Sequence, residues 1–253
     1  TIITDENHEQ YSRVLLPHYI RHKVNREQVF LKKLKWYQEK KIELLKGTKA
    51  VKLNAQNRLV DLDGGEQYQY GKLLIAIGGK VIKLKAPGSD LANILYMRTI
   101  EDADEIIRVG SQSRKGVIIG GGFIGLEFTS CFKLNGVEDL IVLVLEDYYW
   151  QEKLDRFSSK VLTNTLEKNV IKILTNEEVE RFEAKQGASV KGIVGALQTK
   201  SGKTFDVDVV GIGIGIRSDL SWLEGSGIEI NGAIVTNEYL ETNLPGVYAA
   251  GDC

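Results

Sequence analysis

Three glycines, Gly120, Gly122 and Gly125, follow a short apolar run and precede a helix-length segment. The apolar run covers residues 117–119, and the segment covers residues 123–134. In this spacing the first glycine lets the chain turn sharply, the second leaves room for a pyrophosphate at the backbone, and the third lets the helix pack closely on a sheet. The free N–H groups and the positive end of the helix dipole then face the phosphates. The sequence therefore predicts a pyrophosphate-binding turn.

A second apolar run, residues 140–145, ends on Glu146, which lies 21 residues after Gly125. An acid about 20 residues past the glycine motif is placed to bind the ribose 2′-hydroxyl of a dinucleotide. A carboxylate there would repel a 2′-phosphate, so the sequence predicts NAD(H) rather than NADP(H). The flanking strands and the acid favour nucleotide binding over the alternative, a glycine-rich turn that only allows close packing.

The chain has 253 residues and a formal net charge of −1, with two cysteines, Cys131 and Cys253. This length can bury the core of one large domain or two ordinary ones. The charge gives no electrostatic case for binding nucleic acid or an anionic membrane, and no apolar run approaches the roughly 18 residues that span a bilayer. Two cysteines form neither a disulfide framework nor a zinc cage, which is consistent with a soluble protein in a reducing, cytoplasmic setting. Because the chain starts with Thr1 inside a predicted strand, we expect it to be an internal piece of a longer protein.

The rest of the chain alternates predicted strands and helices. It begins with a β-branched run, residues 1–4, which turns acidic at Asp5 and Glu6, as the second strand of a nucleotide-binding unit does. Lysines between residues 29 and 45 are interrupted by glutamates, which indicates a helix with a solvated face that then leads into a strand. The remaining predictions are a short helix within 11–24, a strand meander at 47–69, a buried strand at 73–77, helices at 99–109 and 157–168, a strand at 171–174, short strands around Gly187 and Gly202 at 179–205, a buried strand at 207–216 and further strands at 228–248.

Two other groups of side chains indicate a less specific chemistry. His18 and His22 are four residues apart, as metal ligands on a helix can be, but no third ligand is evident, so no metal site is predicted. The aromatic run at residues 148–150 could line a nicotinamide or substrate cleft. Such a run more often belongs to a core or a subunit contact.

Four stretches together resemble the two-dinucleotide flavoprotein reductases of the pyridine nucleotide–disulfide oxidoreductase superfamily. They are residues 5–13 (DENHEQYSR), 73–79 (LLIAIGG), 120–127 (GGGFIGLE) and 244–253 (LPGVYAAGDC). The resemblance runs from end to end of the chain. Within the superfamily, residues 11–16 (YSRVLL) look most like the flavin domain of assimilatory nitrite reductase large subunits, and like rubredoxin and ferredoxin reductases.

The resemblance implies roles for particular residues. Asp252 would bind the ribityl chain of a flavin, and Glu127 would lie close to the nicotinamide. Arg13 is a candidate contact for a phosphate or the flavin, and the alternative is an ordinary surface arginine. Taken together, the residues expected to bind the cofactors are Asp5, Glu6, Arg13, Ala50, Ala76, Gly78, Gly120, Gly122, Phe123, Ile124, Gly125, Glu127, Glu146, Gly213, Gly215 and Asp252.

Several positions depart from the family pattern. Ile77 stands where the family has a threonine, so that hydroxyl contact is lost, and Ser218 and Asp219 depart from the family's GIGxRPN segment. Pro17-His18 stands where the nearest relatives often carry Ser-Lys, with the lysine near the flavin. Val14 stands where coenzyme A disulfide reductases have a redox cysteine, and a valine excludes disulfide chemistry at that place.

The implied fold is α/β, with two Rossmann-like dinucleotide-binding domains of the FAD/NAD(P)-binding type and a central antiparallel meander. The FAD-binding domain would be discontinuous and incomplete, at 1–103 and 230–253, and the NAD-binding domain would cover 104–229. The family's first glycine motif, in a unit of about 30 residues, would precede Thr1. The helix that follows Asp252 in the family and a C-terminal dimerisation domain would lie beyond Cys253.

The implied activity passes a hydride from NADH to FAD and then electrons to an acceptor protein or domain that these residues do not identify. The cofactors carry this chemistry, so no catalytic side chain is predicted. Neither nucleic acid nor a membrane is expected as a partner, and a homodimer is compatible with the resemblance. The alternative is an NAD(H)-binding fragment, or a sensor of the NADH ratio, that has no flavin and no turnover.

Overall fold

The computed structural model describes residues 1–186 and 192–253, which form two compact units. Unit 1 comprises Thr1–Ser12, Phe30–Lys80 and Ile216–Cys253, and unit 2 comprises Arg13–Val29 and Val81–Gly215. The predicted division into cofactor domains, at 1–103 with 230–253 and at 104–229, stays a prediction. Of the short strands predicted at 179–205, the part around Gly187 lies outside the described residues.

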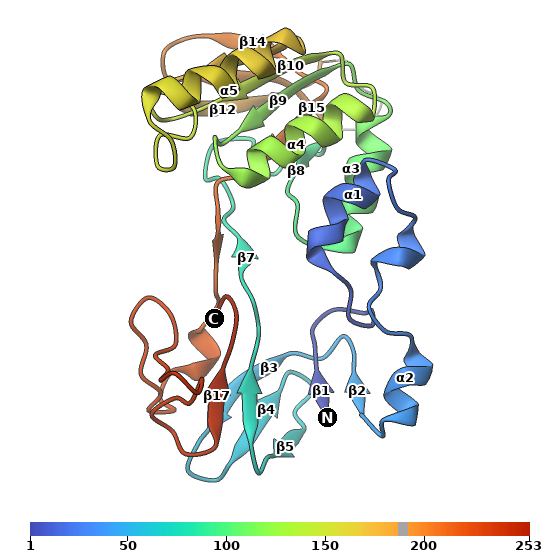
Figure 1. Ribbon diagram of the computed structural model, residues 1–253, viewed down its shortest axis with the longest axis vertical. Helices are drawn as coiled ribbons and strands as arrows, with labels where there is room; N and C mark the ends of the chain where they lie inside the picture. The colour runs from blue at the N-terminus through green and yellow to red at the C-terminus, as the bar shows by residue number, and fades with distance from the viewer. Residues whose placement is uncertain (187–191) are drawn as a thin grey trace. The chain divides into compact units, whose positions relative to one another are not determined.

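A five-stranded parallel sheet forms the centre of unit 2 (Figure 1). Its strands are β8 (Ile94–Leu95), β9 (Lys115–Ile119), β10 (Asp139–Leu143), β11 (Ile171–Leu174) and β15 (Val209–Ile212). They lie in the order β11-β10-β9-β15-β8. From β9 the chain continues to β10 and then to β11 on one side, and β15 later pairs with the other side of β9, between β9 and β8. In β9 every residue after Lys115 is buried, and all of β15 is buried, as expected for parallel strands that are covered on both faces.

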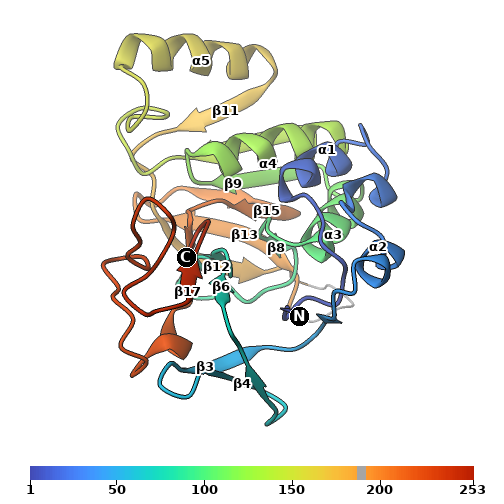
Figure 2. The ribbon, with the colours of Figure 1, turned by 60° about the horizontal axis from the view of Figure 1, so that its bottom comes forward.

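Two layers cover this sheet. On one face lie the antiparallel strands β12 (Val179–Ala184), β13 (Val194–Thr199) and β14 (Thr204–Asp206), and Phe182 and Leu197 from them share one apolar core with Val117 and Val210. On the other face lies helix α4 (Phe123–Leu134). Figure 2 shows α4 and the β12–β13 strands on opposite sides of β9 and β15.

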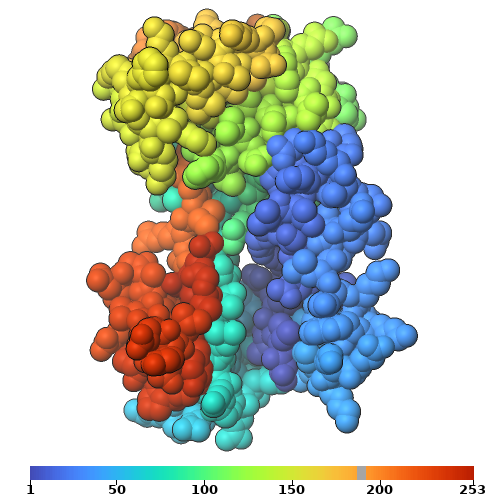
Figure 3. Space-filling model, viewed as in Figure 1, coloured from blue at the N-terminus to red at the C-terminus, as the bar shows by residue number. Residues whose placement is uncertain are grey.

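The other helical segments of unit 2 are η1 (Arg13–Leu15), α1 (Leu16–Ile20), η2 (Arg26–Val29), α3 (Ile100–Gly110) and α5 (Arg156–Lys168). Helix α3 begins with a capping box, in which Thr99 and Asp102 each accept a backbone N–H of the other. The Asp155 carboxylate caps α5, and Phe157 on this helix is exposed. Helix α5 lies at the surface (Figure 3). The helices predicted at 99–109 and 157–168 are confirmed.

Unit 1 contains three small sheets, one short α-helix and one 3-10 helix. Strands β3 (Ala50–Asn54), β4 (Leu59–Leu62) and β5 (Gln67–Gln69) form an antiparallel sheet, which confirms the predicted meander. Strand β1 (Ile2–Ile3) pairs in parallel with β2 (Leu44–Leu45), and β6 (Leu73–Ile75) pairs in parallel with β17 (Val247–Ala249). The remaining helical elements are α2 (Leu34–Glu39) and η3 (Ser221–Leu223). Strand β7 (Lys80–Val81) pairs with β16 (Ile216–Arg217).

Three sequence predictions of elements were wrong in extent. The helix expected within 29–45 is reduced to α2, because Tyr37 is its one buried residue and Lys41 takes a left-handed φ of 54° just after it. The buried strand expected at 207–216 ends at Ile212, since Gly215 turns the chain with a φ of +110°. Within 228–248, a fully described stretch, the chain forms turns and isolated bridges before β17 begins. No helix of the described residues is long and apolar enough to cross a membrane.

Candidate functional site

Gly120, Gly125 and Gly213 approach each other at the carboxyl edge of the parallel sheet in unit 2. Gly120 has a φ of +114°, and a Cβ on it would lie 2.3 Å from the Gly213 carbonyl oxygen. A Cβ on Gly125 would lie 2.0 Å from the Gly120 carbonyl oxygen. Backbone hydrogen bonds fix the turn, because the Gly120 N–H donates to Leu143 at 3.0 Å and the Gly213 N–H donates to Ile119 at 2.9 Å. No side chain larger than hydrogen fits at these three positions without moving the backbone.

Gly122 differs from the other glycines of the motif because open space surrounds it. It is the N-cap residue of α4, has a φ of −87°, and has no other group within 4 Å of the place where a Cβ would be. The first N–H groups of a helix have no partner within the helix. The backbone of Gly122, Phe123 and Ile124 is thus open to an anion on the side that Gly122 leaves free, which is where the motif predicts a pyrophosphate.

Phe123 and Trp150 form an aromatic pair beside this turn. The Phe123 side chain is 63% exposed, and its ring centroid lies 4.9 Å from that of Trp150 in an edge-to-face arrangement. Trp150 stacks in turn on Tyr149, which is buried, and burial raises the pKa of Tyr149 to about 12. Within the aromatic run at 148–150, Tyr149 is therefore part of the core, and Trp150 packs against Phe123.

Glu146 lies three residues past the end of β10, at the same edge of the sheet as the glycine turn. Its backbone carbonyl accepts a hydrogen bond from the Asn176 N–H at 3.2 Å. The side chain is half-buried, and within residues 1–186 and 192–253 no hydrogen bond or ion pair engages its carboxylate. Glu146 therefore presents a carboxylate that is available to a ligand at this edge.

Glu127 lies in the second turn of α4, where Arg21 approaches it. The Arg21 Nη1 is 2.9 Å from the Glu127 Oε2, and the Arg21 side chain is 14% exposed. The contact is an ion pair without hydrogen-bond geometry, and the same Nη1 donates a hydrogen bond to the Ser130 Oγ at 3.0 Å. Sequence reasoning missed Arg21, whose only signal was a basic residue at the end of a short helix.

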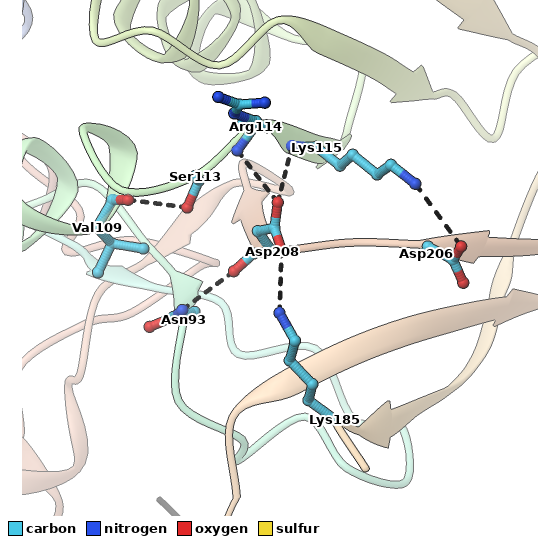
Figure 4. A network of polar contacts seen from close by, with 8 residues as sticks. All are labelled: Asn93, Val109, Ser113, Arg114, Lys115, Lys185, Asp206 and Asp208. Atoms are coloured by element: carbon cyan, nitrogen blue, oxygen red, sulfur yellow. Dashed lines mark hydrogen bonds and ion pairs between the residues drawn. The ribbon is translucent and has the colours of Figure 1, made fainter. Parts of the chain in front are cut away.

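Asp208 holds together the amino ends of β9 and β15, far along the strands from the glycine turn (Figure 4). Its Oδ2 accepts from the N–H groups of Arg114 and Lys115, each at 3.1 Å, and its backbone carbonyl accepts from the Asn93 side chain at 3.0 Å. Lys185 lies 3.4 Å from the other carboxylate oxygen. These contacts fix the parallel register in which Ile119 lies beside Ile212, and so bring Gly120 and Gly213 level with each other.

A second group of predicted residues meets in unit 1, at the carboxyl ends of β6 and β17. The Ala250 N–H donates to the Ile75 carbonyl at 3.0 Å, which sets the loop with Ala76 and Gly78 beside the loop with Asp252. Asp252 is exposed, and the described part of the chain offers its carboxylate no hydrogen bond or ion pair. Its backbone carbonyl accepts a hydrogen bond of 2.8 Å from the hydroxyl of Ser218, one of the residues that depart from the family pattern.

Of the other predicted residues, Gly215 follows Gly213 in the turn after β15, and the rest lie elsewhere in the chain. The Glu6 carboxylate accepts a hydrogen bond of 2.5 Å from the Tyr11 hydroxyl, and Asp5 is exposed beside it. Arg13 donates to the Arg98 backbone carbonyl at 2.5 Å. Ala50 begins the meander in unit 1, and Gly215 forms the turn after β15 in unit 2. Their cofactor roles stay predictions.

The whole sequence, residues 1–253, matches the pyridine nucleotide-disulphide oxidoreductase family. It is 30% identical to nitrite reductase [NAD(P)H] of Bacillus subtilis over 253 residues, which are all of this chain and 31% of that protein. It is 34% identical to monodehydroascorbate reductase 3 of Arabidopsis thaliana over 86% of this chain and 49% of that protein. The chain thus spans about a third to a half of the length of these curated relatives.

Among solved structures, the chain superposes on putidaredoxin reductase from its covalent complex with putidaredoxin. The TM-score is 0.92 at 26% identity, over 99% of this chain and 60% of that one. This likeness confirms the predicted α/β fold of the FAD/NAD(P)-binding type. The match over every residue, with the glycine turn and the two loops formed in the structure, shows that the chain belongs to the pyridine nucleotide-disulphide oxidoreductase family.

Proposed function

We propose that this chain carries the NAD(H) site and part of the flavin site of an NADH-dependent flavoprotein oxidoreductase. The whole protein passes a hydride from NADH to FAD and then electrons to an acceptor protein or domain. The observation that supports this most directly is the glycine turn at the edge of the unit 2 sheet, with the carboxylate of Glu146 uncommitted at the same edge.

The residues of the turn fit a dinucleotide. Gly122 leaves open the space beside the first N–H groups of α4, so that Gly122, Phe123 and Ile124 would hold the pyrophosphate. Glu146 would accept hydrogen bonds from the adenine ribose and would repel a 2′-phosphate, so we propose NADH over NADPH. Bound NADH supplies the hydride. Glu127 is fixed by Arg21 and would orient the nicotinamide.

The loops after β6 and β17 fit one side of a flavin site. Asp252 offers a carboxylate that can accept hydroxyl hydrogens, as a ribityl chain requires, and Gly251 before it has a φ of +90°. Ala76 is exposed on the neighbouring loop, and Gly78 has a φ of +63°. FAD bound there would accept the hydride and pass electrons on, and the chain's own part is to hold the cofactor.

The acceptor and the compartment are further parts of the proposal. The similar proteins include a nitrite reductase and a reductase that is joined to its redox-protein partner, so we propose a redox protein or a fused domain as the acceptor. Cys131 and Cys253 are both buried, free thiols, which agrees with a reducing compartment such as the cytoplasm.

The test combines a spectrum with a substitution. The visible absorbance of the purified chain is recorded before and after addition of NADH, and NADH binding is measured by calorimetry for Glu146→Ala. Loss of a charge-assisted hydrogen bond removes about 1.5–3 kcal/mol, so we expect the NADH Kd to rise about tenfold or more and the preference over NADPH to fall. Glu152→Ala, which removes an exposed glutamate from the same segment, should leave both unchanged.

A flavin spectrum that bleaches with NADH would support flavin binding and hydride transfer from NADH to FAD. A colourless chain that binds NADH would support the alternative, an NAD(H)-binding module. An unaltered cofactor preference in Glu146→Ala would refute the role of Glu146.

A further inference from the structure

The backbone that carries Glu146 is held by one neighbouring segment, residues 174–177. The Val144 N–H donates to the Leu174 carbonyl at 2.9 Å, and the Val144 carbonyl accepts from the Glu177 N–H at 3.0 Å. The Glu146 carbonyl accepts from the Asn176 N–H at 3.2 Å, where Asn176 has a left-handed φ of 57°. Because β10 has already ended at Leu143, these three hydrogen bonds rather than the regular sheet fix the place of Glu146.

Glu177 anchors that segment through its side chain, which is only 2% exposed. One carboxylate oxygen forms an ion pair with Lys203, and the other accepts a hydrogen bond of 2.7 Å from the Ser201 hydroxyl. Both partners lie in the turn between β13 and β14. The hydrogen bonds from Lys203 and Ser201 hold the pKa of Glu177 below its usual value. A buried carboxylate is costly without its partners, so this contact sets where the segment can lie.

The adjacent Glu178 provides a contrast. It pairs with Lys200 at 2.5 Å, but the two side chains are 53% and 60% exposed. Exposed pairs of this kind contribute little to stability and can be remade in many geometries. The chain therefore offers, one residue apart, a buried glutamate that can position its backbone and an exposed one that cannot.

We propose that Glu177 is a positioning residue for the NADH site, which acts by holding the Asn176 N–H against the Glu146 carbonyl. The contacts form one path, from the β13–β14 turn through Glu177 and Asn176 to Glu146. Glu177 does not itself contact the dinucleotide. Glu177 instead determines how well the Glu146 carboxylate is placed to bind the ribose. It thereby affects the preference for NADH over NADPH. The inference rests on the proposed function, because it assigns the support of the same acid.

The experiment measures NADH and NADPH binding to the chain by calorimetry. In Glu177→Gln we expect the NADH Kd to rise about tenfold, as a small displacement of a positioned group does, while the NADPH Kd changes little. The double variant Glu146→Ala with Glu177→Gln should lose no more NADH affinity than Glu146→Ala alone, because the effects of substitutions at residues that act as one unit are not additive. Glu178→Gln should keep both Kd values within about twofold, since its ion pair is exposed.

A second variant covers the case in which Glu177→Gln does not fold. Ser201→Ala removes one hydrogen bond from Glu177 and leaves the ion pair, so a smaller loss of NADH affinity is expected from it. A purely structural role would weaken NADH and NADPH equally, and that result would overturn the proposal. The proposal would also be overturned if Glu177→Gln and Ser201→Ala both folded and kept the original NADH Kd while Glu146→Ala bound NADH more weakly. If the unsubstituted chain bound no NADH, the proposed function would fail, and the inference with it.

Discussion

Replacing Gly125 with alanine should loosen the junction between helix α4 and the turn that precedes it. The new Cβ would lie 2.0 Å from the Gly120 carbonyl oxygen and 3.1 Å from its carbon, both of them backbone atoms. A normal contact begins near 3.4 Å, so the helix start and the turn must separate by roughly 1.4 Å. No flexible side chain can absorb this movement, because the obstacle is the peptide group of Gly120.

The expected cost follows from two opposing effects. Overpacking of this severity destabilises by about 3 kcal/mol, at the upper end for added methyl groups. Alanine in a helix interior recovers about 1 kcal/mol relative to glycine. The net loss in the free energy of unfolding is therefore about 2 kcal/mol. NADH binding should weaken more than tenfold, because the N–H groups at the start of α4 move with the helix.

The matched control is Gly122→Ala, in the same turn. No group lies within 4 Å of its added Cβ, and its φ of −87° suits alanine. Its stability should change by less than about 1 kcal/mol, the cost of a poorer N-cap residue, whereas NADH binding should be lost because the methyl group occupies the space left for phosphate. The assays are urea unfolding followed by circular dichroism and calorimetry with NADH. Equal stability of the two variants, or full NADH affinity in Gly122→Ala, would refute the assignment of the glycines.

Two further predictions concern Asp208, which holds the amino ends of β9 and β15 together, and Glu177, which anchors residues 174–177. Asp208→Ala should reduce the free energy of unfolding by about 2 kcal/mol, since the N–H groups of Arg114 and Lys115 lose an ionised acceptor, and a change below about 0.5 kcal/mol in urea unfolding would contradict this. The pKa of Glu177 is lowered by its hydrogen bonds to Lys203 and Ser201, so its stabilising effect is present above the ordinary value of 4.5 and is lost as the pH falls below it. The stability difference between the unsubstituted chain and Glu177→Gln should therefore shrink from pH 7 to pH 4, and a difference that grew on acidification would contradict the sign.

The glycine turn could be predicted from the sequence because its requirements are local. Gly120, Gly122 and Gly125 are spaced within one turn, and the acid follows at the end of the next strand. The sequence also predicted the order of strands and helices around them, since buried parallel strands have continuous apolar runs. The strand predicted at 207–216 failed for the opposite reason. Its apolar residues continue past Ile212, but the backbone turns at Gly215 and leaves the sheet, and no hydrophobic pattern encodes that turn.

The supports of the site could not be predicted, because they depend on residues far apart in the chain. Pro17-His18 replaces the Ser-Lys of the nearest relatives, so the sequence did not predict lysine-assisted tuning of the flavin, and it gave no sign of Arg21. In the structure a cation reaches Glu127 from Arg21, a few residues further along the chain. Glu177 also depends on distant residues, because its partners Lys203 and Ser201 lie more than twenty residues away in the chain. The partners of Glu127 and Glu177 come from other segments of the chain, so they are found from the contacts in the folded structure rather than from the spacing of motif residues.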